Sequence, residues 1–281
     1  MPSPPLEPGL YVVATPIGNL RDVTLRALDV LGAASRVYAE DTRITRKLLD
    51  AYGLTPRLSA YHDYSDETVR DEVLAAIARS EAVALVSDAG TPLISDPGFK
   101  LVRAALEAGH KVIPIPGASA ALAALVAAGL PTDRFFFAGF PPSKGGARKA
   151  WLEDIADIRA TLVLYETGPR LSESLSDMAA VLGNRQAAVA RELTKLFEEV
   201  KRGDLMSLAA FYESAPPKGE IVVLIERAPE AAPASEDEVN AMLRGALQRV
   251  SVKEAAGEAA QRFGIPRKKA YARALAIRDE P

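Results

Sequence analysis

Apolar strand-like runs alternate with amphipathic helical segments along the first 130 residues. This alternation is typical of βαβ units, in which parallel strands form one sheet and helices cover its faces. The strand-like runs are LYVVA at 10–14, SRVYA at 35–39, RLSAY at 57–61, AVALVS at 82–87 and KVIPIP at 111–116. The pattern therefore predicts an α/β fold built on a mostly parallel sheet.

Small or acidic residues follow four of these strands. The turns are PIGN at 16–19, EDTR at 40–43, DAGTP at 88–92 and PGAS at 116–119. Ligands of open α/β sheets bind outside the carboxyl ends of the strands, so these turns predict a ligand site at one sheet edge. The first candidate is the long loop SDAGTPLISDPG at 87–98, and a tight connection without a ligand is the alternative. None of the turns matches the dinucleotide or P-loop patterns, so neither site is predicted.

The composition narrows the class of chemistry. The 281 residues include no cysteine and two histidines, which excludes disulfides and thiolate metal sites and leaves no local zinc motif. No metal is therefore expected. No secretion signal and no apolar run of membrane-spanning length is found, which favours a cytoplasmic protein without a membrane partner. The net charge of -3 does not itself indicate nucleic-acid binding.

The second half predicts a second, mixed sheet with a hairpin. Its strand-like runs are FFFAGF at 135–140, ATLVLY at 160–165, AAVARE at 187–192 and KGEIVVLIE at 218–226. Between the first two, PPSKGGARKA at 141–150 predicts a basic loop, and Trp151 is expected to begin a helix and pack. In the first half, Ser65 or Asp66 is the expected cap of the helix that follows.

The C-terminal segment differs in charge from the rest of the chain. Residues 228–236 have the composition of a linker, and three short helices are expected beyond it, with Gly264 ending the second and Pro266 opening the third. The segment from Arg244 to Arg278 contains nine lysines and arginines but only two acidic residues. This pattern is typical of a helix-turn-helix that binds nucleic acid, and a solvated helical tail is the alternative.

Seven motifs in order resemble the tetrapyrrole methylase family, in particular those members that methylate ribosomal RNA. They are YVVATPIGNLRDVTLRAL, AEDTRITRKLL, LVSDAGTPLISDPG, IPIPGASA, LYETGPRL, ARELTKLFEE and PPKGEIVVLIE. The resemblance covers residues 10 to about 226, and the helical module also fits. It implies two α/β domains, at 1–116 and 117–227, with a cofactor cleft between them and a basic helical module at 237–281.

The resemblance also implies an activity and its partners. The expected enzyme is a homodimer that uses S-adenosylmethionine to methylate the 2′-hydroxyl of a cytidine in the decoding region of 16S rRNA, within the 30S subunit. Where the family has a Gly-Asp-Pro loop, this chain has Gly90, Thr91 and Pro92, and Asp88 is a possible substitute for the missing aspartate. The expected cofactor contacts are Pro16, Ile17, Gly18, Asp88, Gly90, Thr91, Ile94, Ser119, Ala120, Tyr165, Arg191, Leu193 and Gly219.

The chemistry of methyl transfer to a ribose calls for a group that positions the hydroxyl and accepts its proton. The candidates at strand ends are Glu40, Asp41, Glu166, Glu192 and Lys195, and capping or ion pairing is the alternative role for each. Candidates for holding RNA phosphates are Arg43, Arg46, Lys47, Lys144, Arg148, Lys149 and Arg170, with Arg267, Lys268, Lys269 and Arg273 in the module.

Two other functions fit parts of the sequence. One is a methyltransferase acting on a tetrapyrrole or another small molecule, although such a substrate requires neither the basic module nor the lysines and arginines at 144–149. The other is a nucleic-acid-binding protein whose α/β body senses a ligand without catalysis.

Overall fold

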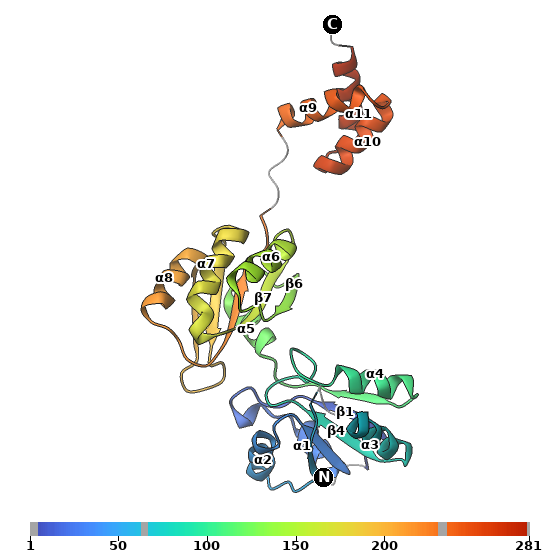
Figure 1. The fold of residues 1–281 in the computed structure, drawn as a ribbon, viewed down its shortest axis with the longest axis vertical. Helices are drawn as coiled ribbons and strands as arrows, with labels where there is room; N and C mark the ends of the chain where they lie inside the picture. The colour runs from blue at the N-terminus through green and yellow to red at the C-terminus, as the bar shows by residue number, and fades with distance from the viewer. Residues whose placement is uncertain (1–4, 63–66, 230–234, 280–281) are drawn as a thin grey trace. The chain divides into compact units, whose positions relative to one another are not determined.

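The structure is a computed structural model that describes residues 5–62, 67–229 and 235–279. The chain divides into two compact units, residues 1–228 and residues 229–281 (Figure 1). Among the described residues, no helix combines the length and the apolar character needed to cross a lipid bilayer. The predicted caps Ser65 and Asp66 and most of the predicted linker at 228–236 lie outside the described residues.

The first sheet is fully parallel, with strand order β3-β2-β4-β1-β5. Its strands are β1 (Gly9–Val13), β2 (Arg36–Ala39), β3 (Leu58–Ala60), β4 (Ala82–Val86) and β5 (Val112–Ile115). Two apolar cores cover its faces. The helices α1 (Leu25–Ala33) and α2 (Thr42–Ala51) contribute to one core, and α3 (Glu67–Ala78) and α4 (Phe99–Glu107) contribute to the other. The predicted parallel α/β sheet is confirmed.

Side-chain caps set where several helices begin. Thr24, Asp41 and Ser119 each precede a helix and accept a hydrogen bond from a backbone N–H of its first turn. Such caps satisfy donors that have no partner inside the helix. Because Asp41 caps α2, the EDTR turn is short and the helix starts at Thr42, inside this turn.

The second sheet is mixed, with order β6-β7-β10-β8-β9. β6 (Phe135–Gly139) and β7 (Thr161–Thr167) are parallel, whereas β10 (Glu220–Ile225) runs antiparallel to both β7 and β8 (Gln186–Arg191). β9 (Glu199–Asp204) pairs antiparallel with β8. The expected mixed sheet and hairpin are present, but β9 and the helix after it, α8 (Leu205–Ser214), were not predicted.

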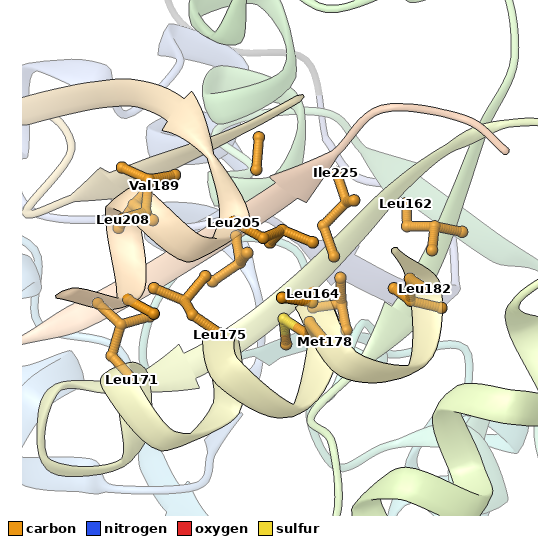
Figure 2. Packing of buried hydrophobic residues seen from close by; sticks show 14 of the residues in the cluster. Leu162, Leu164, Leu171, Leu175, Met178, Leu182, Val189, Leu205, Leu208 and Ile225 are labelled. Atoms are coloured by element: carbon orange, nitrogen blue, oxygen red, sulfur yellow. The ribbon is translucent and has the colours of Figure 1, made fainter. Parts of the chain in front are cut away.

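Helices cover both faces of this sheet. The core in Figure 2 joins α7 (Leu171–Leu182), α8 and α6 (Gly145–Ile155) to one face, through side chains such as Leu164, Leu175 and Leu205. The alanine-rich α5 (Ala120–Ala128) covers the other face. The partly buried Trp151 packs against the first of these cores, as expected, although it lies inside α6 rather than at its start.

The loop predicted at 141–150 is wrong from Gly145 onward, because α6 begins there. The reason is tertiary. The Arg148 side chain is fully buried and forms ion pairs with Asp177 and Glu173 of α7, and Leu152 packs in the core beneath it. These contacts hold the first turn of α6 despite its two glycines, whose helix propensity is low.

The second unit contains three helices: α9 (Glu236–Leu247), α10 (Val252–Phe263) and α11 (Arg267–Arg278). They enclose an apolar core of their own that includes Leu243, Ala256 and Ala274. Gly264 ends α10 in the left-handed conformation and Pro266 precedes α11, as the sequence predicts. The module is therefore a packed helical unit rather than a solvated tail, while the predicted division of the first unit at residue 116 stays a prediction.

Candidate functional site

One pocket of about 430 Å³ lies where the strand-end turns of both sheets meet within the first unit. The first sheet contributes Ile17, Glu40, Ser119 and the segments 88–91 and 94–96. The second sheet contributes Phe140, Tyr165 to Thr167, Glu192 to Leu193 and the start of β10. Its volume falls in the range of about 300–1,000 Å³ that is typical of small-ligand sites.

Hydrogen bonds tie the turns of the first sheet to one another. The backbones of Thr15 and Gly90 pair in both directions, at 2.8 and 3.1 Å, which joins the turns after β1 and β4. Thr91 Oγ1 donates to the carbonyl oxygen of Ala118 at 3.2 Å and so links the turn after β5. The pocket wall is therefore built from backbone that the sheet holds rigidly.

The turn after β2 is attached to the same wall through Asp88. Its Oδ1 accepts a hydrogen bond from the backbone N–H of Asp41 at 2.8 Å. Asp88 is the residue considered as a substitute for the aspartate of the family's loop. One of its carboxylate oxygens holds the EDTR turn, and the residue also lines the pocket.

The two loops that border the pocket carry unusual backbone conformations. Non-glycine residues adopt positive φ at Leu93 (73°) and Ser95 (60°) in one loop, and at Glu192 (48°) and Thr194 (67°) in the other. Such conformations cost free energy and gather at ligand sites, where the surrounding structure enforces them. The second loop also contacts the turn after β1, because the Asn19 backbone N–H donates to Thr194 Oγ1 at 3.1 Å.

Asp96 is the titratable group most altered by this pocket. Burial raises the pKa of its carboxyl to about 7, and the negative charges of Glu40, Asp88 and Glu220 act in the same direction. A carboxyl with such a pKa can accept a proton near neutral pH.

The carboxyl of Asp41 stands apart from the pocket. Hydrogen bonds from the Arg43 side chain and backbone lower its pKa to about 2. Asp41 does not line the pocket, and its carboxyl is committed to capping α2 and pairing with Arg43 at 2.6 Å. The structure thus supports the capping role that the sequence left open.

Glu166 lines the pocket but its carboxylate points into protein. It is buried and accepts hydrogen bonds from the Ser174 hydroxyl and the Thr167 backbone N–H, and Arg170 pairs with it at 3.3 Å. These partners make it a structural group at the end of β7.

Lys195 forms ion pairs with Glu192 at 3.1 Å and with Glu220 at 3.4 Å at the rim of the pocket. Burial acts to lower its pKa, but the hydrogen bond from its ammonium to Glu192 and the nearby acids outweigh burial, and the pKa is raised. A lysine accepts a proton readily only when its pKa is lowered, so the raised pKa favours acceptor positioning over proton removal as the role of Lys195.

Most of the expected cofactor residues lie together in this pocket. The residues that line it are Ile17, Asp88, Gly90, Thr91, Ile94, Ser119, Ala120, Tyr165, Leu193 and Gly219. Pro16, Gly18 and Arg191 do not line it. A Cβ on Gly18 would lie 2.4 Å from Cγ of Lys195, so Gly18 instead allows the Lys195 side chain to approach the first turn.

The basic residues expected to hold phosphates are dispersed. Arg43, Arg46, Lys47, Lys144 and Lys149 are exposed, and Arg170 is half-buried beside Glu166. Arg148 is a correction: its guanidinium is fully buried between Asp177 and Glu173, so it is not available to a phosphate. In the module, Arg267, Lys268, Lys269 and Arg273 are exposed on α11.

Several pocket residues escaped the sequence interpretation, including Ser95, Asp96, Phe140 and Glu220. The motif SDPG held a usable signal, because it contains an acid in the candidate loop. The sequence around Phe140 held no such signal, because Phe140 and Tyr165 are distant in the chain and only the tertiary structure brings their rings together, with centroids 5.4 Å apart.

Comparisons with known proteins agree with this architecture. Residues 9–209 match the family model described as tetrapyrrole (corrin/porphyrin) methylases, and residues 233–278 match the model of the RsmI C-terminal HTH domain. A protein of Mesorhizobium japonicum named ribosomal RNA small subunit methyltransferase I is 49% identical, with 99% of this chain and 95% of that protein covered. The protein of the same name from Erythrobacter litoralis is 53% identical, with coverages of 98% and 97%.

Solved structures share the fold at lower identity. The methyltransferase CobJ is 20% identical with a TM-score of 0.58, and the match covers 80% of this chain and 97% of that one. A uroporphyrin-III C-methyltransferase from Thermus thermophilus, solved with S-adenosyl homocysteine, is 21% identical with a TM-score of 0.53 and coverages of 77% and 96%. Because the family model spans most of the first unit and the fold agrees, this chain belongs to the tetrapyrrole methylase family.

Proposed function

We propose that this protein uses S-adenosylmethionine to methylate the 2′-hydroxyl of a cytidine in the decoding region of 16S rRNA, within the 30S subunit. The observation that carries the proposal is the pocket at the joined sheet edges, which combines a rigid backbone wall with a proton-accepting carboxyl. Relatives named ribosomal RNA small subunit methyltransferase I, at 49% and 53% identity over nearly the whole chain, support RNA as the substrate.

The pocket fits a nucleoside-bearing cofactor. Gly90 lines it with a φ of +84°, and a Cβ there would lie 3.3 Å from Ile17 Cγ2, so backbone stays exposed to a ligand at this point. Ile17, Ile94 and Leu193 offer apolar surface, and polar backbone accompanies it at Thr91 and Gly219. When bound, S-adenosylmethionine supplies the methyl group as an electrophile.

The chain must then place the acceptor hydroxyl and receive its proton. We propose Asp96 as the proton acceptor. It lines the pocket, and burial together with the negative charges of Glu40, Asp88 and Glu220 raises the pKa of its carboxyl to about 7. Glu192 and Lys195, which pair at 3.1 Å on the opposite loop, are proposed to orient the ribose. General-base catalysis of this kind contributes about 10²- to 10⁴-fold to a rate.

The helical module supplies features suited to the RNA backbone. Ser235 and Ser251 form capping boxes at the starts of α9 and α10, whereas α11 begins without a side-chain cap. Its first turn instead carries Arg267, Lys268 and Lys269. Unpaired N–H groups and cations at a helix start favour a phosphate, so we propose that α11 contacts RNA there, with Arg273 on the same helix.

A homodimer and a cytoplasmic location remain part of the proposal. Apolar side chains on the first unit support self-association, since Leu122 and Val126 of α5 and Phe135 of β6 are exposed. Exposed apolar groups gathered on a surface are typical of protein interfaces.

The decisive experiment measures transfer of labelled methyl groups from S-adenosylmethionine to three acceptors: 30S subunits lacking the modification, protein-free 16S rRNA and a tetrapyrrole. We expect label in the RNA of 30S subunits, recovered as 2′-O-methylcytidine after digestion to nucleosides. Label in the tetrapyrrole alone would favour the small-molecule alternative. Tight cofactor binding without transfer to any acceptor would favour a non-catalytic ligand sensor.

A further inference from the structure

A second cavity, of about 610 Å³, adjoins the methyl-transfer pocket in the first unit. We call it the aromatic pocket, because Phe197, Phe211 and Tyr212 line it together with Pro216 and Pro217. Glu192 and Gly219 line both cavities, so the two cavities lie on either side of these residues. A ligand that extends from the first pocket past Glu192 and Gly219 would reach the second.

The aromatic side chains of this pocket are unevenly covered. Phe197 is 67% exposed and Phe211 is 38% exposed, which is costly for side chains of this size unless a ligand covers them. The Lys201 ammonium lies 3.6 Å from the centroid of the Phe211 ring. The pocket therefore combines a large exposed apolar surface at Phe197 with a positive charge on the Phe211 ring.

Tyr212 supplies a second, independent signal. It is only 2% exposed, and within the part of the chain that the structure describes its hydroxyl has no hydrogen-bond partner. Burial raises the pKa of this phenol to about 12, the charge of Glu199 acts in the same direction, and Arg191 opposes it. The hydroxyl therefore lies near the Arg191–Glu199 ion pair, whose two residues line the aromatic pocket. A buried hydroxyl without a partner is uncommon in proteins and calls for one.

The charges favour one class of occupant. Glu192 and Glu199 line the pocket, but their charges are paired with Lys195 and Arg191. Lys218 also lines it and Lys201 lies beside it on Phe211, and these two cations suit a ligand carrying negative charge. Unpaired RNA bases are bound by stacking on aromatic rings, hydrogen bonds to base edges and cations near the phosphates. All three kinds of group are present here.

We propose that the aromatic pocket binds an unpaired base of the RNA substrate that neighbours the methylated nucleotide, stacked on Phe197 and hydrogen-bonded by the Tyr212 hydroxyl. This inference rests on the proposed function, because it assigns a subsite of the same RNA. It adds a site that selects the conformation of the RNA around the target, since a base must leave its helix to enter.

The test uses the full-length protein, 30S subunits and the variants Phe197→Ala and Tyr212→Phe. Stacking on a base is worth a factor of about 5 to 150 in affinity, so Phe197→Ala is expected to raise KM for RNA within that range. Loss of one neutral hydrogen bond predicts an increase of about 2- to 12-fold for Tyr212→Phe. The affinity for S-adenosylmethionine, measured by calorimetry, should not change, because neither residue lines the first pocket.

Leu106→Ala is the matched control, since Leu106 is 58% exposed on α4 and lines neither cavity. It should leave KM for RNA unchanged. A second readout places 2-aminopurine at each position flanking the target in an RNA fragment. Quenching on binding to the wild-type protein, lost in Phe197→Ala, would locate the stacked base.

The outcomes separate the two proposals. If the wild-type protein methylates RNA but both variants keep its KM and the quenching, the aromatic pocket is not a base subsite. If Tyr212→Phe only raises thermal stability, its hydroxyl is an unsatisfied core group and the inference fails. A Phe197→Ala variant that loses its dimeric mass by light scattering would assign the surface to a second copy of the chain instead. Absence of RNA methylation by the wild type would overturn the proposed function itself.

Discussion

At the scale of single residues, two aspartates that follow strands of the first sheet acquire opposite properties from their surroundings. The carboxylate of Asp41 accepts hydrogen bonds from the Arg43 side chain and from backbone N–H groups, which stabilise its charged form and lower its pKa to about 2. Asp96 is partly buried among other acids, which disfavours its charged form and raises its pKa to about 7. Of these two carboxyls, only that of Asp96 can exchange a proton near neutral pH, and Asp96 lines the pocket whereas Asp41 does not.

Replacing Asp96 tests this assignment through pH dependence. The wild-type methylation rate is expected to rise with pH and level off above about 7, because only the carboxylate accepts a proton. Asp96→Asn should lower kcat by about 10²-fold or more and abolish this rise. An unchanged pH profile in the variant would assign the proton to another group.

The same substitution has a stability readout. Because the folded-state pKa of Asp96 lies above the ordinary value of 3.8, its contribution to stability is fully present below pH 3.8 and declines as the pH rises to about 7. Asp96→Asn should therefore raise the melting temperature at pH 8 relative to the wild type, and by more than it does at pH 4. Equal shifts at both pH values would show that the carboxyl is not destabilised by its surroundings.

Gly90 tests the backbone wall of the pocket. Its φ of +84° is costly for any residue with a Cβ, by about 1–2 kcal/mol, and its N–H and C=O pair with Thr15. Gly90→Ala is expected to weaken S-adenosylmethionine binding by about 5- to 30-fold in calorimetry. Gly53→Ala is the control, since Gly53 has a φ of +66° and open space around it but does not line the pocket. Equal losses of affinity in both variants would indicate a general effect on the fold.

At the scale of elements, contacts between α6 and α7 decide where α6 begins. Arg148 is fully buried and lies 2.5 Å from Asp177, while the exposed Lys149 lies 3.2 Å from the same aspartate. The buried arginine thus joins the two helices, and the lysine adds a weaker surface pair.

Truncating these two residues should give unequal losses of stability. Arg148→Ala leaves Asp177 without its buried partner and is expected to lower the free energy of unfolding by about 3 kcal/mol. Lys149→Ala is expected to cost about 0–1 kcal/mol. Urea denaturation followed by circular dichroism measures both, and a loss of under 1 kcal/mol for Arg148→Ala would contradict the structural role of this pair.

At the scale of the whole molecule, we propose that two units with separate cores have separate functions, cofactor binding in the first and RNA binding in the second. The pocket lies within residues 1–228, and the exposed basic residues of α11 belong to residues 229–281. Because each unit encloses its own apolar cluster, removing the second leaves the cores of the first intact.

Deleting residues 229–281 should separate cofactor binding from RNA binding. The shortened protein is expected to keep its affinity for S-adenosylmethionine within twofold, while KM for 30S subunits rises by at least tenfold through lost phosphate contacts. A full-length variant with Arg267, Lys268 and Lys269 changed to Ala should show the same direction with a smaller effect. Parallel loss of cofactor affinity would mean that the module supports the pocket.

Local patterns sufficed for much of this architecture. Strand periodicity and the turns PIGN, EDTR, DAGTP and PGAS predicted the parallel sheet and the edge where the pocket lies. Gly264 and Pro266 likewise predicted the boundary between α10 and α11. These features depend on residues close together in the chain, so they can be predicted from the sequence without knowledge of the tertiary structure.

Other features depend on residues far apart in the chain, and only the tertiary structure decided them. The edge strand β9 and the start of α6 rely on pairing with β8 and on the buried Arg148–Asp177 contact. The properties of Asp96 depend on Glu40 and Glu220, which approach it through different sheets. The sequence by itself determined the strand-end turns and the family motifs, because both are local. The fold determined which side chains share the pocket and which carboxyl can accept a proton, because burial and charge arise from contacts that no local pattern contains.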